Sequence, residues 1–293
     1  MALKLPFLQV DVFTNTPFKG NPVAVINCMN IDESLLSDKQ LQAIANWTNL
    51  SETTFLFKPT TDGCDYKLRI FTPMCELPFA GHPTIGSCKA FLQFTGQKTA
   101  KSLKQECKSG IVNLTISSEG KISFKAPRAD IEEIPQDVIN EYRKILQIDC
   151  VAAPKLLDVG PIWVVYLTSD AESCYNANPD FAQMAIINNK YGHGGIILAG
   201  KKPGSSQDYE MRAFVPADGV QEDPVCGSGS IALIRYLQDL HNFTETTEVN
   251  ITQGGRLTRQ GEIFCQIKGN ADGAFSYISG GNATIVIEGS INI

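Results

Sequence analysis

The sequence of 293 residues lacks the features that define several large classes of protein. No stretch approaches the ~18 apolar residues of a membrane-spanning helix, and the apolar patch at the start is too short for the core of a signal peptide. There is no cluster of Lys and Arg, and a net charge of -6 suits a phosphate backbone poorly. We therefore expect a cytoplasmic protein whose partners are neither membranes nor nucleic acids.

The spacings typical of metal sites are also missing. The nine cysteines are an odd number, and the closest pair in sequence, Cys64 and Cys75, has neither Cys-x-x-Cys nor zinc-finger spacing. Only His82, His193 and His241 could supply imidazole ligands, and no two of them lie at helical spacing. The sequence therefore predicts a reduced intracellular chain with no dedicated metal site.

What the sequence does contain is an internal repeat. Residues 66–73 (YKLRIFTP) match residues 209–216 (YEMRAFVP), with Tyr, Arg, Phe and Pro in register about half a chain apart. A glycine-containing turn follows each copy, at residues 80–86 and 226–232. With 43% hydrophobic residues the chain can bury a core in each half, so we predict two copies of one domain.

The helix after each turn indicates how a domain is built. Residues 83–94 and 231–240 carry apolar side chains on more than one face, as expected for a helix enclosed by a sheet. We predict an α/β (α+β) fold of two pseudo-symmetric domains, each a barrel-like sheet wrapped around a central helix. The predicted domains are 1–128 and 129–282, the last strand at about 283–293 is a candidate member of the first, and the active site is expected in the cleft between them.

Periodicity predicts the elements around the two central helices. A hairpin is expected from strands at 8–13 and 23–26, followed by a helix at 37–46 that a Ser37–Gln40 capping box begins. Glu52 then stands at the mouth of a strand at 53–57. A longer outer helix is predicted across 128–147, with Pro135 in its first turn.

Both glycine turns begin a helix, whose unpaired N–H groups and dipole favour an anion. For a single copy, simple capping of the helix would be the better interpretation. Because the same turn occurs twice, we predict that the two helix starts bind a small anionic carboxylate substrate. The candidate substrate-binding residues are Gly81, Pro83, Thr84, Cys226, Gly227, Ser228 and Gly229.

Glu52 is the candidate catalytic base. The corresponding position in the second copy falls near His193 and Gly194, so only one copy carries a carboxylate there. That asymmetry suits an enzyme in which one group removes and returns a proton. A solvated glutamate at the start of a strand is the alternative, and for this residue alone it is the simpler one.

Three other side chains have both a chemical and a structural interpretation. His82, at the positive end of a helix, could polarise a substrate oxygen as a neutral imidazole, although a lone histidine is more often structural. Asp223 could hold a substrate amine or hydroxyl, or complement the helix dipole together with Glu222. Ser228 occupies the position of His82 in the second copy and could bind substrate or cap its helix.

Cys226 supports a different mechanism. A thiol at a helix N-terminus is expected to have a lowered pKa and to act as a base. The twin position is Ala80, so a symmetric two-thiol mechanism lacks half of its apparatus. Residues 227–232 also match a dinucleotide-binding fingerprint, but the acids before them and the missing βαβ unit argue against NAD.

Five ordered motifs, spread over nearly the whole chain, resemble the phenazine-biosynthesis PhzF family in the form of its fungal members. They are residues 9–14 (QVDVFT), 20–25 (GNPVAV), 50–54 (LSETT), 79–84 (FAGHPT) and 222–228 (EDPVCGS). The resemblance implies the fold of diaminopimelate epimerase, a homodimer, and catalysis without a metal or an organic cofactor. In the founding activity of that family, a glutamate moves a proton between carbons of trans-2,3-dihydro-3-hydroxyanthranilate.

Carried over to matching positions, the resemblance implies that Glu52 is the acid and base, supported by His82, Asp223 and Ser228, with backbone donors from Gly81 and Gly227. One position departs from the pattern, because Cys226 stands where the family commonly has Thr. We therefore expect a cofactor-independent isomerase. The alternatives are an epimerase or racemase that uses Cys226 as a base opposite Glu52, and a non-catalytic protein that binds a metabolite or another protein.

Overall fold

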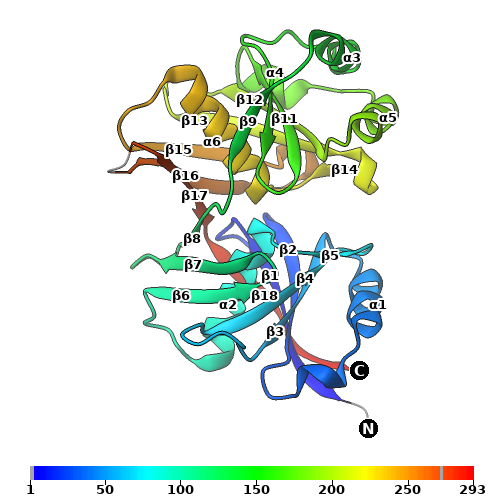
Figure 1. Cartoon of the computed structure of the whole chain (residues 1–293), viewed down its shortest axis with the longest axis vertical. Coiled ribbons are helices and arrows are strands. Elements are labelled where there is room, and N and C mark those ends of the chain that lie inside the picture. The colour runs from blue at the N-terminus through cyan, green and yellow to red at the C-terminus, as the bar shows by residue number, and fades with distance from the viewer. Residues whose placement is uncertain (1–2, 271–272) are drawn as a thin grey trace. The chain divides into compact units, whose positions relative to one another are not determined.

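The computed structural model describes residues 3–270 and 273–293 as a mixed α/β fold made of two compact units. The first unit contains the chain up to Lys125 together with Gly280–Ile293, and the second contains Ala126–Ser279. The chain therefore passes between the units twice, after Lys125 and after Ser279. Figure 1 shows how strands surround a helix in each unit.

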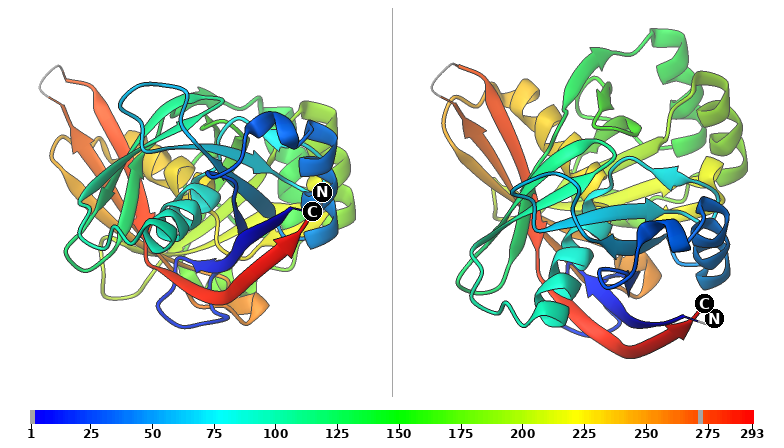
Figure 2. Two further views of the ribbon diagram at one scale, coloured as in Figure 1. Left: turned by 90° about the horizontal axis from the view of Figure 1, so that it is seen from below. Right: turned by 60° about the horizontal axis from the view of Figure 1, so that its bottom comes forward.

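The sheet of the first unit begins with β1 (Lys4–Val12), which pairs antiparallel with both β2 (Asn21–Asn27) and the last strand, β18 (Ala283–Asn292). The two ends of the chain consequently lie side by side, and Leu3 N donates to Ile293 O at 2.7 Å (Figure 2). The remaining strands are β3 (Glu52–Phe57), β4 (Tyr66–Phe71), β5 (Glu76–Leu77), β6 (Ser102–Cys107), β7 (Gly110–Ile116) and β8 (Ile122–Lys125).

Two α-helices complete the described part of the first unit. Helix α1 (Asp38–Thr48) begins with the predicted capping box, in which Ser37 N donates to Gln40 Oε1 at 3.0 Å and Gln40 N donates to Ser37 Oγ. Helix α2 (Gly81–Thr95) packs against β1, β2, β3, β8 and β18, and its apolar residues are buried on more than one face. It is therefore the central helix that the sheet encloses.

The second unit repeats this plan. Its strands are β9 (Asp130–Glu133), β10 (Lys155–Asp158), β11 (Ile162–Thr168), β12 (Gly195–Lys201), β13 (Asp208–Val215), β14 (Val220–Asp223), β15 (Thr247–Gln253), β16 (Gly261–Gly269) and β17 (Phe275–Gly281). The central helix is α6 (Gly227–His241), which packs against β10, β11, β12 and β16. Its outer helices are α3 (Gln136–Leu146), α4 (Ala171–Asn176) and α5 (Phe181–Tyr191).

Strand directions show that the two units are copies of one fold. In the first, β2 is parallel to β3, β3 is antiparallel to β4, and β4 is parallel to β6. In the second, β11, β12, β13 and β15 follow the same sequence of directions. The central helices α2 and α6 each have 15 residues and begin at glycines in equivalent positions. The predicted fold class is thus confirmed.

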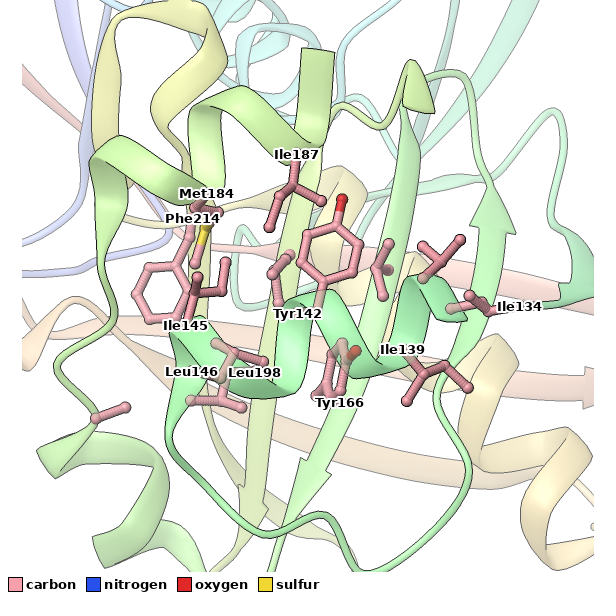
Figure 3. Packing of buried hydrophobic residues seen from close by; sticks show 14 of the residues in the cluster. Ile134, Ile139, Tyr142, Ile145, Leu146, Tyr166, Met184, Ile187, Leu198 and Phe214 are labelled. Carbon is pink, nitrogen blue, oxygen red and sulfur yellow. The ribbon is translucent and has the colours of Figure 1, made fainter. Parts of the chain in front are cut away.

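Helices α3 and α5 of the second unit pack on its strands and form a hydrophobic core with them. Tyr142 and Ile145 of α3 and Met184 of α5 pack on Tyr166 and Leu198 of the sheet (Figure 3). The apolar residues of α3 were predicted from their helical spacing, and they are the residues that the helix buries.

One predicted helix is wrong in its first part. Residues 128–147 were expected to be helical throughout, but residues 130–133 form β9, which pairs antiparallel with β10. Helix α3 begins only after Pro135, because a proline disfavours helical geometry in the residue before it. Strands β5, β6 and β14 and helix α4 were not predicted, since β5, β14 and α4 are short and β6 (SLKQEC) has Leu103 as its one large apolar residue.

The repeated YxxRxFxP segment is explained by an ion pair that occurs in both copies. Arg69 of β4 binds Glu76 with two hydrogen bonds, at 2.8 and 3.0 Å, and Arg212 of β13 binds Glu222 with two, at 3.0 and 2.6 Å. Each glutamate lies on the short strand that leads into the central helix. We call these two pairs the arginine–glutamate clamps.

The clamps also explain the phenylalanine of the repeat. The Arg69 guanidinium lies 5.2 Å from the centre of the Phe71 ring, and that of Arg212 lies 4.8 Å from the ring of Phe214. The second clamp is the more buried, with both side chains 5% exposed, against 13% for Arg69 and 22% for Glu76. Each clamp ties a long strand to the turn from which a central helix starts.

The difference in burial predicts unequal losses of stability. Glu222→Gln leaves Arg212 charged in a desolvated position, and we expect the free energy of unfolding to fall by about 3–5 kcal/mol. Glu76→Gln, at the wetter clamp, should cost about 1 kcal/mol, since Arg69 keeps Glu33 and Asp38 as partners. Urea unfolding of the two variants measures this, and equal losses would contradict the assigned burial.

Candidate active site

The first unit brings Glu52 and His82 together. Glu52 is the first residue of β3, and His82 is the second residue of α2. Glu52 Oε2 lies 3.0 Å from His82 Nδ1, and the two side chains are 16% and 5% exposed. Among the described residues no donor is aligned for a hydrogen bond with Glu52 Oε2, so the contact with His82 is a close approach of two polar groups.

Local structure places Glu52 at this point. Helix α1 ends at Thr48, and its C-cap Asn49 has a left-handed backbone (φ 55°) that reverses the chain while its N–H closes the last turn on Ala45 O. The chain then enters β3 with Glu52 opposite Val23 of the parallel strand β2. The carboxylate is therefore held at the end of a strand, beside the start of the central helix.

The start of α2 is suited to a ligand with negative charge. Its N-cap is Ala80, and no described side chain caps the helix there. Gly81, His82, Pro83 and Thr84 are all buried in this first turn. The positive end of the helix dipole is thus not offset by a capping acid, which favours an anion next to Glu52 and His82.

Thr84 has a structural partner. Its hydroxyl accepts a hydrogen bond at 3.1 Å from Gln105 Nε2 of β6, and Gln105 Oε1 accepts another from Tyr66 at 3.2 Å. Gln105 is fully buried. The threonine side chain therefore helps to fix the turn, and the interaction was not predicted because Gln105 lies on a strand that the sequence pattern does not reveal.

The second unit gathers Asp223, Cys226, Gly227, Ser228 and Gly229 at the start of α6. Asp223 Oδ1 accepts from Val225 N at 3.1 Å, and Cys226 Sγ accepts from Gly229 N at 3.3 Å. These contacts give the turn a side-chain cap that the first unit lacks.

A buried glutamine supports this second turn from the sheet. Gln253 of β15 donates to Asp223 O at 2.7 Å and accepts from Cys226 N at 2.9 Å. The side chain is 1% exposed. Sequence reasoning missed Gln253, although a glutamine at a buried position of an alternating strand was a signal that could have identified it.

Glu222 has a different role from its neighbour Asp223. The sequence suggested two acids that complement the helix dipole, whereas the structure pairs Glu222 with Arg212 on its own sheet. Only Asp223 remains at the start of the helix, where it accepts from Val225 N. The two acids therefore differ in role, since Glu222 binds Arg212 of the neighbouring strand β13 and Asp223 lies at the turn before α6.

Cys226 behaves contrary to the expectation for a thiol at a helix start. The side chain is 4% exposed, and burial raises its pKa well above the usual range, with the negative charge of Asp223 adding to the effect. The backbone N–H of Gly229 and the hydroxyl of Ser228 lower the pKa too little to offset this. The predicted lowering is therefore wrong, because desolvation by burial is the largest effect on the pKa of this thiol.

Ser228 is contacted from the sheet of its own unit. Trp163 Nε1 of β11 donates to Ser228 Oγ at 3.2 Å, and Cys226 Sγ lies 3.5 Å from the same oxygen. Ser228 and His82 occupy equivalent positions in the two helices. The equivalent side chains His82 and Ser228 therefore each contact a residue from a strand of their own unit, Glu52 and Trp163 respectively.

Within residues 3–270 and 273–293, no group of three or more His, Cys, Asp or Glu side chains is arranged to hold a metal ion. In the same residues, no helix is both long enough and apolar enough to cross a membrane.

Comparison with known proteins gives consistent matches along the chain. The family model PhzC-PhzF, described as phenazine biosynthesis-like protein, matches residues 10–289. A protein of Schizosaccharomyces pombe named antisense-enhancing sequence 1 is 40% identical over 294 residues, covering 97% of each chain. The trans-2,3-dihydro-3-hydroxyanthranilate isomerase of Pseudomonas aeruginosa is 28% identical, covering 97% of this chain and 98% of its own.

A solved structure extends the similarity to the fold. The PhzF-family phenazine biosynthesis protein of Bacillus anthracis superimposes with a TM-score of 0.85 at 21% identity. The match covers 99% of this chain and 100% of that protein. At this level of identity the likeness concerns the arrangement of helices and strands.

The burial of Cys226 predicts how it reacts with alkylating reagents. Iodoacetamide needs the thiolate, so Cys226 should stay unmodified in the folded protein near neutral pH and react only after denaturation. Cys75, which is exposed, serves as the internal control that reacts first. Mass spectrometry of the digested protein measures both sites, and labelling of native Cys226 as fast as Cys75 would contradict the raised pKa.

Proposed function

This chain belongs to the phenazine biosynthesis-like PhzC-PhzF family, and on that premise we propose that it is an isomerase that moves a proton between two carbons of a small carboxylate substrate. Several relatives carry names that state an isomerase activity, among them one named for trans-2,3-dihydro-3-hydroxyanthranilate. We propose a substrate of the same chemical class, a small unsaturated or amino-substituted acid.

The observation that carries the proposal is the contact between Glu52 and His82. A carboxylate 3.0 Å from an imidazole, largely shielded from water, lies beside a helix start that favours an anion. A general base must reach a proton and be held in one position, and the end of a strand supplies that position. The pair thus combines a proton acceptor with a binding site for the substrate's charge.

In the proposed reaction, the Glu52 carboxylate removes a proton from one carbon of the substrate. The electron pair left behind shifts through the adjacent double bond, and the Glu52 carboxylic acid returns the proton at the other end. Substrate and product have the same atoms, so no oxidant or other co-reactant is required. His82, whose Nδ1 lies 3.0 Å from Glu52 Oε2, borders the carboxylate during both steps.

We propose, as the family resemblance implies, that Gly81 at the start of α2 and Gly227 at the start of α6 each supply a backbone N–H group to the substrate. The family resemblance assigns Asp223 and Ser228 to the same reaction, and we propose that both contact the substrate. Their own contacts support this assignment, because each is held at the start of α6 by a defined hydrogen bond.

An epimerase that uses Cys226 as its base is the second candidate. The position of the thiol at a helix start favours it, but burial and Asp223 raise the pKa of the thiol, and the twin residue is Ala80. A base of high pKa is mostly protonated near pH 7, so we rank this candidate below the Glu52 mechanism. A non-catalytic binding protein is the third, and it predicts ligand binding without turnover.

Replacing the proposed base should abolish proton transfer. We expect Glu52→Gln, which keeps the shape of the side chain, to lower the rate of deuterium incorporation from D2O by about 10²–10⁴-fold. Proton NMR of trans-2,3-dihydro-3-hydroxyanthranilate and of a panel of small amino and hydroxy acids measures the incorporation at each carbon.

Glu119→Gln is the matched control, because it makes the same change at an exposed site of the same unit. Wild type and this control should behave alike. If Glu52→Gln incorporates deuterium as fast as wild type, Glu52 is not the base. If wild type binds an acid but exchanges no proton across the panel, the binding-protein candidate gains support.

The reaction should also be independent of metal ions. We expect full activity after dialysis against EDTA, since the proposed chemistry needs only a carboxylate and hydrogen-bond donors. The assay is the same deuterium incorporation, measured before and after chelation and again after Mg²⁺ or Zn²⁺ is added back. A loss that one of these ions restores would refute cofactor independence.

A further inference from the structure

The strand pairings identify the counterpart of Glu52 in the second unit. In the first unit, Glu52 precedes Thr53, which pairs with Phe71 of β4. In the second unit, Gly195 precedes Ile196, which pairs with Phe214 of β13. Because Phe71 and Phe214 are the same position of the repeat, Gly195 occupies the place of Glu52.

Gly195 cannot be replaced by a residue with a side chain without a rearrangement. A Cβ atom there would overlap the carbonyl oxygen of Phe214 and would lie 2.7 Å from Cζ3 of Trp163. Trp163 pairs with Gly195 in the parallel strands β11 and β12, and its side chain is 3% exposed. The indole of Trp163 therefore fills the space on the side where the first unit has its carboxylate.

The same indole determines how Ser228 is hydrogen-bonded. An indole N–H can only donate, so Ser228 Oγ is the acceptor of the 3.2 Å bond from Trp163 Nε1. A serine hydroxyl has one hydrogen, and this bond leaves that hydrogen to point elsewhere, toward Cys226 Sγ at 3.5 Å or toward a ligand. Trp163 thereby prepares Ser228 to donate.

We propose that Trp163 is a positioning residue that fixes Ser228 as a hydrogen-bond donor to an oxygen of the substrate. The inference rests on the proposed function, in which Ser228 contacts the substrate. In the first unit a glutamate contacts the side chain at the helix start, and in the second a tryptophan does so. The two units thus share the arrangement of strand and helix start. In the proposal, the first unit supplies the base Glu52 and the second supplies the hydrogen-bond donor Ser228.

NMR of the ligand-free protein tests the hydrogen bond independently of activity. The chain has only two tryptophans, and Trp47 is exposed, so Trp47→Phe leaves the indole N–H of Trp163 as a single resonance. Ser228→Ala should move this resonance upfield and speed its exchange with water. Ser173→Ala, a matched change elsewhere in the unit, should leave it in place. An unchanged resonance in Ser228→Ala would overturn the proposal.

A double-mutant cycle tests the positioning role. Trp163→Phe, which removes the N–H and keeps an aromatic ring, should lower kcat/KM by about 3- to 10-fold, as expected for one hydrogen bond. In the Ser228→Ala background the same substitution should have no further effect. Full, additive losses in the cycle would overturn the proposal, since Trp163 would then act without Ser228.

The cycle is measured both on turnover and on the binding of anthranilate, an unreactive aromatic carboxylate. Absence of turnover in wild type would contradict the proposed function, while the resonance and the anthranilate cycle would still decide the role of Trp163. Tyr236→Phe, which removes another buried hydrogen bond of the same unit at Ala153 O, is the control for a general loss of stability. It should change neither measurement.

Discussion

The ion pair between Arg212 and Glu222, and its counterpart between Arg69 and Glu76, is the interaction on which both halves of this protein depend. Each arginine extends from a long strand and holds, through two hydrogen bonds, the glutamate of the short strand that leads into a central helix. The helix start, where the candidate site residues lie, is fixed by this contact. Desolvated charges are costly unless paired, so the buried clamp of Arg212 and Glu222 requires a partner of matching charge and shape.

The two units have the same fold but different side chains at the start of the central helix. The side chain at the helix start is His82 in one and Ser228 in the other, and the sheet contacts it through Glu52 and Trp163 respectively. The difference follows from space, because Gly195 has no room for a side chain beside Trp163. The duplicated fold therefore carries a carboxylate at this position in one unit and a glycine in the other, which is the asymmetry that a one-base isomerase needs.

The sequence was sufficient for the parts of the structure that repeat. The match of residues 66–73 with 209–216 predicted two copies of one domain, and the apolar faces of the helices predicted their enclosure. Contacts between residues far apart in the chain could not be predicted from the sequence. Examples are the hydrogen bonds from Gln253 to Asp223 O and from Trp163 to Ser228. The pKa of Cys226 was misjudged for the same reason, because the helix position is visible in sequence and the burial is not. The prediction of one helix over 128–147 failed at Pro135. A proline disfavours helical geometry in the residue before it, and this effect outweighed the helical spacing of the apolar residues.

The most direct test of a one-sided mechanism is deuterium incorporation from D2O by Cys226→Ala, measured in the same assay as Glu52→Gln. A buried thiol of raised pKa contributes packing and a cap to α6, so we expect folded Cys226→Ala to retain proton transfer within a few-fold of wild type. Incorporation that Cys226→Ala loses and Glu52→Gln retains would place the base in the second unit and contradict the account.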